Sequence, residues 1–109
     1  MTIRLMRVCG HSMAPALADG QVVLVGATHP LSLRRGDVVA ARPKGLGGKA
    51  CVKWIAGLPH ERMTLAHETR QLGPDEYFLA GDQAEDSLDS RTLGPITQEE
   101  LIGRVWLSL

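Results

Sequence analysis

Short apolar runs separated by Gly, Pro and Asp are the feature that most constrains how this chain can fold. Gln21 to Val25 lies between Asp19-Gly20 and Gly26, and Asp37 to Arg42 follows the turn-forming pair Arg35-Gly36. Apolar runs of roughly four to eight residues bounded by turn residues indicate strands, because helices need at least about ten residues. The pattern predicts a mainly β fold.

The other elements follow from the same pattern. Pro43 to Gly48 has the composition of a turn and precedes the apolar run Lys49 to Ala56, so the second and third runs predict a β-hairpin. Thr97 to Glu100 matches a capping box and predicts one short helical turn. Further strands are expected at Met63 to Ala66, Arg70 to Leu72, Glu76 to Ala80 and Ile102 to Leu107.

Length and charge exclude several classes of protein. A chain of 109 residues is long enough for one core, so we expect a single compact domain over residues 1–109. Lys plus Arg and Asp plus Glu both number 12, and this neutral balance is unlike that of a nucleic-acid-binding protein. No apolar run approaches the roughly 20 residues of a membrane span, and Met1 to Val8 lacks the core of a signal peptide. We expect a soluble, cytoplasmic protein without a transmembrane segment.

The two cysteines do not form a disulfide framework of the kind found in small secreted proteins. Cys9 and Cys51 each lie in an apolar run, where a free cysteine behaves as a small buried hydrophobe. Because Cys9 is close in sequence to Ser12 and Cys51 is close to Lys53, a Cys9–Cys51 disulfide is the alternative interpretation.

Ser12 is the first candidate catalytic residue. It stands in Gly10-His11-Ser12-Met13-Ala14-Pro15, where the chain turns, but serine is also a common residue of purely structural turns. A nucleophilic serine needs a base. His11 would point to the opposite face of an extended segment, and the contexts of His29, His60 and His67 favour exposed side chains. A Ser–His–Asp triad therefore has little support.

Lys53 is the more informative residue. It is the only charged residue in the run from Ala50 to Ala56. It either faces solvent from an alternating strand or is drawn into an apolar site. Burial of an ammonium lowers its pKa, which would make a neutral lysine available as a base for a serine nucleophile.

The segment Gly81 to Pro95 lacks strand periodicity and is rich in Asp and Ser, so we expect a long functional loop. Within it Asp89 and Arg91 can form an ion pair, and Ser87 can offer a hydroxyl group to a neighbour. A solvated acidic loop is the alternative.

Taken in order, these segments resemble the motifs of the type I signal peptidases. The motifs are Gly-X-Ser-Met-X-Pro-X-Leu, Gly-Asp-Val-Val, Val-Lys-X-X-X-Gly-Leu-Pro and Gly-Asp-X-X-X-X-Ser-X-Asp-Ser-Arg, and they extend over nearly the whole chain. The resemblance implies the signal-peptidase/LexA-like catalytic β-fold and a serine endopeptidase that removes a leader peptide from a precursor protein. It implies no cofactor and no metal.

The resemblance also assigns roles to residues. Ser12 matches the nucleophile and, through its backbone N–H, one oxyanion-hole donor, and Lys53 matches the general base. Ser87 matches the serine that orients the lysine amine, and Asp89 and Arg91 match a supporting ion pair. The second oxyanion donor of some members has no counterpart, because Gly10 stands at its position.

The chain differs from typical members in lacking an N-terminal membrane span and in the short segment between Pro59 and Glu76. Anchorless members resembling this chain include the maturation proteases of nickel-containing superoxide dismutase, so the precursor of that enzyme is the expected substrate. The alternatives are a general signal peptidase that acts with a membrane partner and a non-catalytic peptide-binding module of the same fold. The self-cleaving repressors of the LexA type share the Ser–Lys chemistry. They need a DNA-binding segment and a cleavable Ala-Gly bond upstream of the serine, and the residues before Ser12 leave no room for either.

Overall fold

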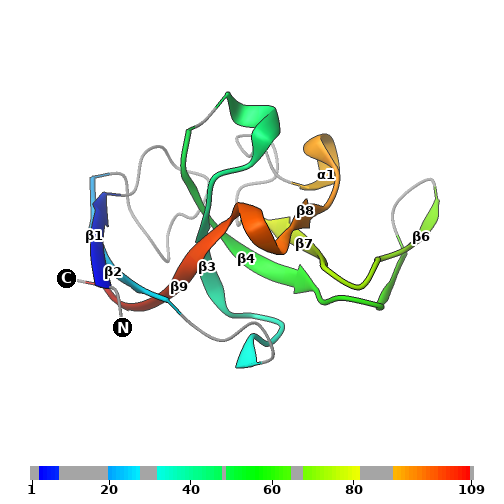
Figure 1. Cartoon of the computed structure of the whole chain (residues 1–109), viewed down its shortest axis with the longest axis horizontal. Coiled ribbons are helices and arrows are strands. Elements are labelled where there is room, and N and C mark those ends of the chain that lie inside the picture. Colours follow the sequence, from blue (N-terminus) through cyan, green and yellow to red (C-terminus); the bar gives the residue numbers. More distant parts are fainter. Residues whose placement is uncertain are drawn as a thin grey trace.

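The computed structural model describes residues 3–7, 20–27, 32–47, 49–64, 68–81 and 90–108. Its main element is a seven-stranded antiparallel sheet with the order β1-β2-β9-β3-β4-β7-β8, which confirms the mainly β class (Figure 1). The strands are β1 (Ile3–Arg7), β2 (Val22–Gly26), β3 (Val38–Ala41), β4 (Cys51–Gly57), β7 (Glu76–Ala80), β8 (Ile96–Thr97) and β9 (Leu101–Ser108).

Every strand expected from the sequence is present, with ends shifted by at most two residues. Two strands, β1 and β8, were not predicted from the sequence. β1 carries Arg4 and Arg7 beside its apolar residues, and β8 is too short to show a period. Among the described residues three short helical turns occur: η2 (Lys44–Leu46), α1 (Ser90–Leu93) and η4 (Gln98–Glu100). η4 is the turn that the capping box predicts, whereas α1 corrects the prediction that all of residues 81–95 form a loop.

The β3–β4 hairpin places β4 in the middle of the sheet. The backbone N–H of Ile55 donates to the carbonyl of Asp37 (2.8 Å), and the carbonyl of Ile55 accepts from the N–H of Gly36 (2.8 Å). Gly36 has φ +88°, a conformation that glycine adopts without strain. In this register Val39 lies opposite Lys53. On its other side β4 pairs with β7 from Trp54 to Gly57.

Both faces of the sheet are covered by apolar side chains. One cluster of buried residues consists of Val23, Val25, Ala40 and Val52. The other consists of Leu33, Val39, Ala41, Ile55, Tyr77, Leu79 and Ile96. Because successive side chains of a strand point to opposite faces, β4 contributes Val52 to the first cluster and Ile55 to the second. Apolar clusters therefore lie on both faces of β4.

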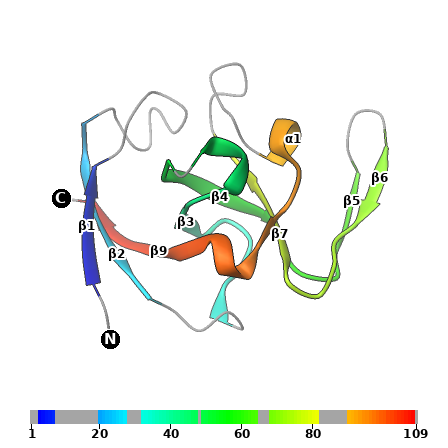
Figure 2. The ribbon, with the colours of Figure 1, turned by 45° about the horizontal axis from the view of Figure 1, so that its top comes forward.

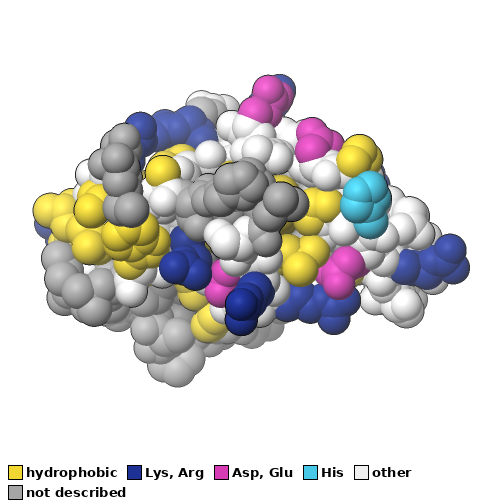
Figure 3. All heavy atoms as spheres, turned by 60° about the horizontal axis from the view of Figure 1, so that its bottom comes forward, with side chains coloured by type: hydrophobic (Ala, Val, Ile, Leu, Met, Phe, Trp, Pro, Cys, Tyr) yellow, Lys and Arg dark blue, Asp and Glu magenta, His cyan; other side chains and the backbone are white. Residues whose placement is uncertain are grey.

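The β1 end of the sheet carries exposed apolar side chains. Figure 3 shows hydrophobic side chains at this end, and the large exposed hydrophobic residues of the described chain are Ile3, Leu5 and Trp106. The indole of Trp106 covers Gly26 so closely that a Cβ there would lie 2.4 Å from ring atoms. In the part of the chain that the structure describes, no helix is long and apolar enough to cross a membrane.

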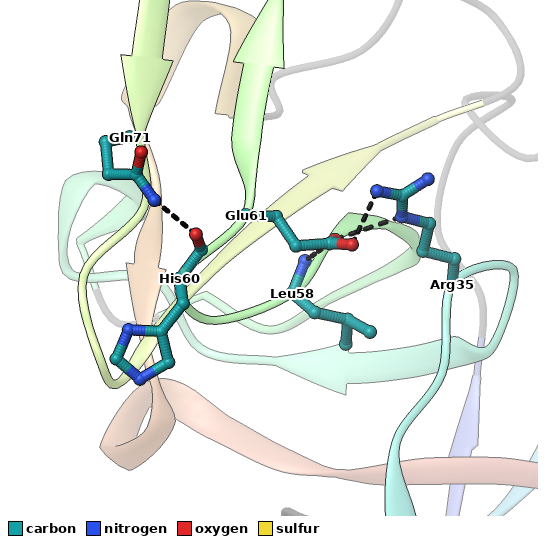
Figure 4. Close-up of polar contacts among 5 residues, drawn as sticks. All are labelled: Arg35, Leu58, His60, Glu61 and Gln71. Carbon is teal, nitrogen blue, oxygen red and sulfur yellow. Dashed lines mark hydrogen bonds and ion pairs between the residues drawn. The ribbon is translucent and has the colours of Figure 1, made fainter.

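A two-stranded ribbon, β5 (Arg62–Thr64) and β6 (Thr69–Gln71), stands away from the sheet beyond β7 (Figure 2). Its base is held by the carboxylate of Glu61, which accepts two hydrogen bonds from the Arg35 guanidinium (3.0 and 2.5 Å) and one from the N–H of Leu58 (2.6 Å) (Figure 4). The hydrogen bond from Arg35 holds the pKa of Glu61 below its ordinary value. The amide of Gln71 donates to the carbonyl of His60, whose φ is +70°.

Candidate active site

Lys53 is a buried charged residue in the middle of β4. Only 4% of its surface is exposed. It shares a sheet face with Cys51 and Ile55, which precede and follow it by two residues, and with Val39 opposite it. These three neighbours belong to, or pack against, the second apolar cluster. Of the two interpretations of Lys53, the buried one is correct.

The strand β7 pairs with β4 from the residue after Lys53 onward. Its last residue, Ala80, pairs with Trp54, and Gly81 directly follows β7. Arg91 is the second residue of α1, and its Nη2 donates a hydrogen bond to the carbonyl of Gly81 (3.3 Å). Arg91 is therefore joined through Gly81 to the part of the sheet that holds Lys53.

Ser90 is a second buried polar residue near this strand, with 5% of its surface exposed. Its Oγ accepts a hydrogen bond from the backbone N–H of Leu79 (2.9 Å), and Leu79 pairs with Ile55. The sequence motif contains Ser90 but assigned it no role. Residues 81–95 contain one other serine, Ser87, and nothing in the sequence indicates which group the Ser90 hydroxyl contacts.

The flanks of the segment with Ser12 are also fixed. Arg7, at the end of β1, pairs with Val22, and its Nη1 donates to the carbonyl of Gly20 (2.9 Å). Residues 7 and 20, which enclose the segment with the predicted nucleophile, are thus held together across the β1–β2 hairpin. Of the predicted site residues, Lys53 and Arg91 are described, and the others, Ser12, Ser87 and Asp89, lie outside the described residues.

Other candidates from the sequence are placed as follows. His60 is exposed at the base of the ribbon, as its context predicted, and His11, His29 and His67 lie outside the described residues. Cys51 is half-buried in β4, and Cys9 lies outside the described residues. Within the described ranges, no group of three or more His, Cys, Asp or Glu side chains could hold a metal ion.

Comparison with known proteins gives a consistent result. The family model "Signal peptidase, peptidase S26" matches residues 1–69 and 60–109. Mitochondrial inner membrane protease subunit 1 of Schizosaccharomyces pombe is 34% identical over 89% of the chain, and its counterpart in Xenopus tropicalis is 26% identical over 90%. Signal peptidase I of Streptococcus pneumoniae is 38% identical over 69% of the chain.

These relatives are longer than the chain. The aligned region spans 69% of the fission yeast protein, 64% of the frog protein and 37% of the pneumococcal enzyme. The family model nevertheless covers the whole sequence, from β1 to β9. The chain therefore belongs to the signal peptidase family, peptidase S26.

Proposed function

We propose that this protein is a serine endopeptidase in which Ser12 is the nucleophile and Lys53 is the general base, and that it removes an N-terminal leader from a precursor protein. The observation that carries the proposal is the burial of Lys53 in an apolar part of β4. An ammonium is poorly solvated in such a place, so burial favours the neutral amine that a base requires.

The proposed reaction follows from these two groups. The neutral amine of Lys53 accepts the hydroxyl proton of Ser12 while Oγ attacks the scissile carbonyl, and the resulting ammonium then protonates the leaving amine. The N–H of Ser12 donates to the oxyanion, an interaction worth about 3–4 kcal/mol in comparable sites. Water hydrolyses the acyl-enzyme. Ser87 orients the amine of Lys53, and an ion pair of Asp89 with Arg91 supports it.

The substrate in this proposal is an extended peptide that adds as a strand near Ser12 and places alternate side chains in small apolar pockets. A precursor of nickel-containing superoxide dismutase, processed in the cytoplasm, is the proposed physiological substrate. The second candidate is a general signal peptidase that acts with a membrane partner. The names of the relatives, an inner membrane protease and signal peptidase I, favour this candidate.

The dyad is tested with an internally quenched peptide that contains an Ala-X-Ala cleavage site of the signal-peptide type. Ser12→Ala and Lys53→Met should both lack turnover while their circular dichroism spectra match the wild type. Near-normal turnover by Lys53→Met would disprove the assignment of the base. Cleavage by the wild type should rise between about pH 6 and pH 9 as Lys53 loses its proton, whereas a flat profile would argue against the dyad.

The substrate is tested separately by mass spectrometry. Purified precursor of nickel superoxide dismutase and a signal-peptide-bearing precursor are each incubated with the wild type and with Ser12→Ala. Cleavage of the first alone supports the maturation role, and cleavage of the second, with or without vesicles, supports the general signal peptidase. A wild type that binds both peptides and cleaves neither would identify a non-catalytic binding module.

A further inference from the structure

The edge of β7 that faces away from β4 is only partly covered by a strand. Ile55 directs its N–H and C=O toward the β3 side, so its partner Leu79 directs its own N–H away from β4. β8 pairs with Glu76 and Tyr77 and ends before it reaches Leu79. The hydroxyl oxygen of Ser90 accepts this N–H, in the place where a longer β8 would have supplied a carbonyl.

α1 makes two further contacts on the same side. Arg91 donates to the carbonyl of Gly81, the residue that directly follows β7. Leu93 packs against η2 at the tip of the β3–β4 hairpin, where a Cβ on Gly45 would lie 3.2 Å from its Cδ2. α1 is thus attached to β7 and to the hairpin that contains Lys53.

We propose that Ser90 is a positioning residue for the catalytic dyad. Residues 82–89 start directly after Gly81 and end directly before Ser90, so the hydrogen bond from Leu79 fixes the end of the segment that carries Ser87 and Asp89. Ser87 precedes Ser90 by three residues, which span at most about 10 Å. The inference rests on the proposed function, in which Ser87 orients the amine of Lys53, and adds the residue that fixes Ser87 relative to β4.

Kinetics of Ser90→Ala on the quenched Ala-X-Ala peptide test this role. A misplacement of a catalytic group by about 1 Å can lower a rate by roughly 100-fold. We expect a loss of that size in kcat with KM nearly unchanged, and recovery of most of the loss in Ser90→Thr, which keeps the hydroxyl. A kcat for Ser90→Ala within a few-fold of the wild type would overturn the proposal.

The matched control is Thr97→Ala, which removes a hydroxyl hydrogen-bonded to Glu100 in η4 (3.0 Å). Both variants should unfold at lower urea concentrations than the wild type, but only Ser90→Ala should lose kcat. An equal loss of kcat in Thr97→Ala would show that Ser90 has only a structural role. If Ser90→Ala does not fold, Ser90→Cys replaces it, since a thiol of similar size is a weaker acceptor. Folded Ser90→Cys with wild-type kcat would also refute the proposal.

A readout independent of cleavage separates this inference from the proposed function. The sequence has three lysines, Lys44, Lys49 and Lys53, and the first two are exposed, so ¹³C-labelled lysine gives a resolvable NMR titration with two internal references. In Ser90→Ala the titration midpoint of Lys53 should differ from that of the wild type, because the amine would lose the Ser87 hydroxyl that orients it in the proposed function. An unchanged midpoint refutes the role of Ser90. Turnover by Lys53→Met would instead refute the dyad itself.

Discussion

Replacement of Glu100 by Gln should destabilise the protein through the loss of one acceptor atom. The carboxylate accepts hydrogen bonds from the N–H of Lys44 (2.8 Å), the N–H of Thr97 (2.8 Å) and the hydroxyl of Thr97 (3.0 Å). The two N–H groups bind different oxygens, so in either orientation of Gln one of them faces an NH₂ group. With a charge-assisted bond lost and a donor left unsatisfied, the free energy of unfolding should fall by about 2 kcal/mol.

For a domain of about 100 residues, this loss lowers the unfolding midpoint by roughly 10 °C. Differential scanning calorimetry and urea unfolding of Glu100→Gln measure both quantities. The adjacent Glu99 provides the control, because its bond to the Lys44 ammonium (2.9 Å) is exposed at both side chains, 76% for Lys44 and 70% for Glu99. An exposed pair of this kind contributes little, so Glu99→Gln should unfold like the wild type. Equal losses of stability in Glu100→Gln and Glu99→Gln would refute the inference that Glu100 contributes more to stability than Glu99.

The difference in stability between the wild type and Glu100→Gln should depend on pH. Burial acts to raise the pKa of Glu100, but the hydrogen bonds from Thr97 and Lys44 outweigh it, so the pKa lies below the ordinary value of 4.5. A carboxyl whose pKa is lower in the folded state stabilises the fold fully above its unfolded pKa and ceases to do so as the pH falls through its folded pKa. The stability gap between wild type and Glu100→Gln should therefore be constant near neutrality and shrink below about pH 4.5. A gap that widens with acid would contradict this.

Three further outcomes are expected. His60→Gly should be as stable as the wild type or more stable by up to about 1 kcal/mol, because glycine adopts a φ of +70° without strain. If His60→Ala resisted urea better than His60→Gly, this expectation would be wrong. Gly26→Ala should lower the free energy of unfolding by about 1–3 kcal/mol, because the added Cβ would collide with the ring of Trp106. The same collision should shift the tryptophan emission, and an unchanged spectrum would be inconsistent with the contact. The denatured, unreduced protein should titrate two thiols, Cys9 and Cys51, and fewer would indicate the disulfide.

The strands and the position of Lys53 could be predicted because both depend on local patterns. Alternation and turn residues around β3, β4 and β7 specify these strands without reference to the rest of the chain. A single lysine in an apolar run is conspicuous for the same reason. The run alone left open whether Lys53 was exposed. The answer came from the apolar cluster on its face of the sheet, whose residues are contributed by several strands.

Ser90 shows why part of the site could not be predicted. Its hydroxyl matters because Leu79 has an N–H that points away from β4 and because β8, whose first residue Ile96 pairs with Tyr77, does not extend to Leu79. Both conditions arise from the register of strands that are distant in sequence. The residues near Ser90 in the sequence show neither condition, so no local signal gives Ser90 a role different from that of Ser87, the other serine of residues 81–95.

The order of the strands also determines when the site can be assembled during synthesis. The hairpin that flanks Ser12, β1–β2, and the hairpin that contains Lys53, β3–β4, do not pair with each other in the described sheet, and β9 lies between them. A ribosome-bound chain that has not yet released residues 101–108 can form each hairpin separately but cannot join them. On the proposed mechanism, a nascent chain would be inactive until its β9 emerged, and could not cleave other polypeptides emerging nearby.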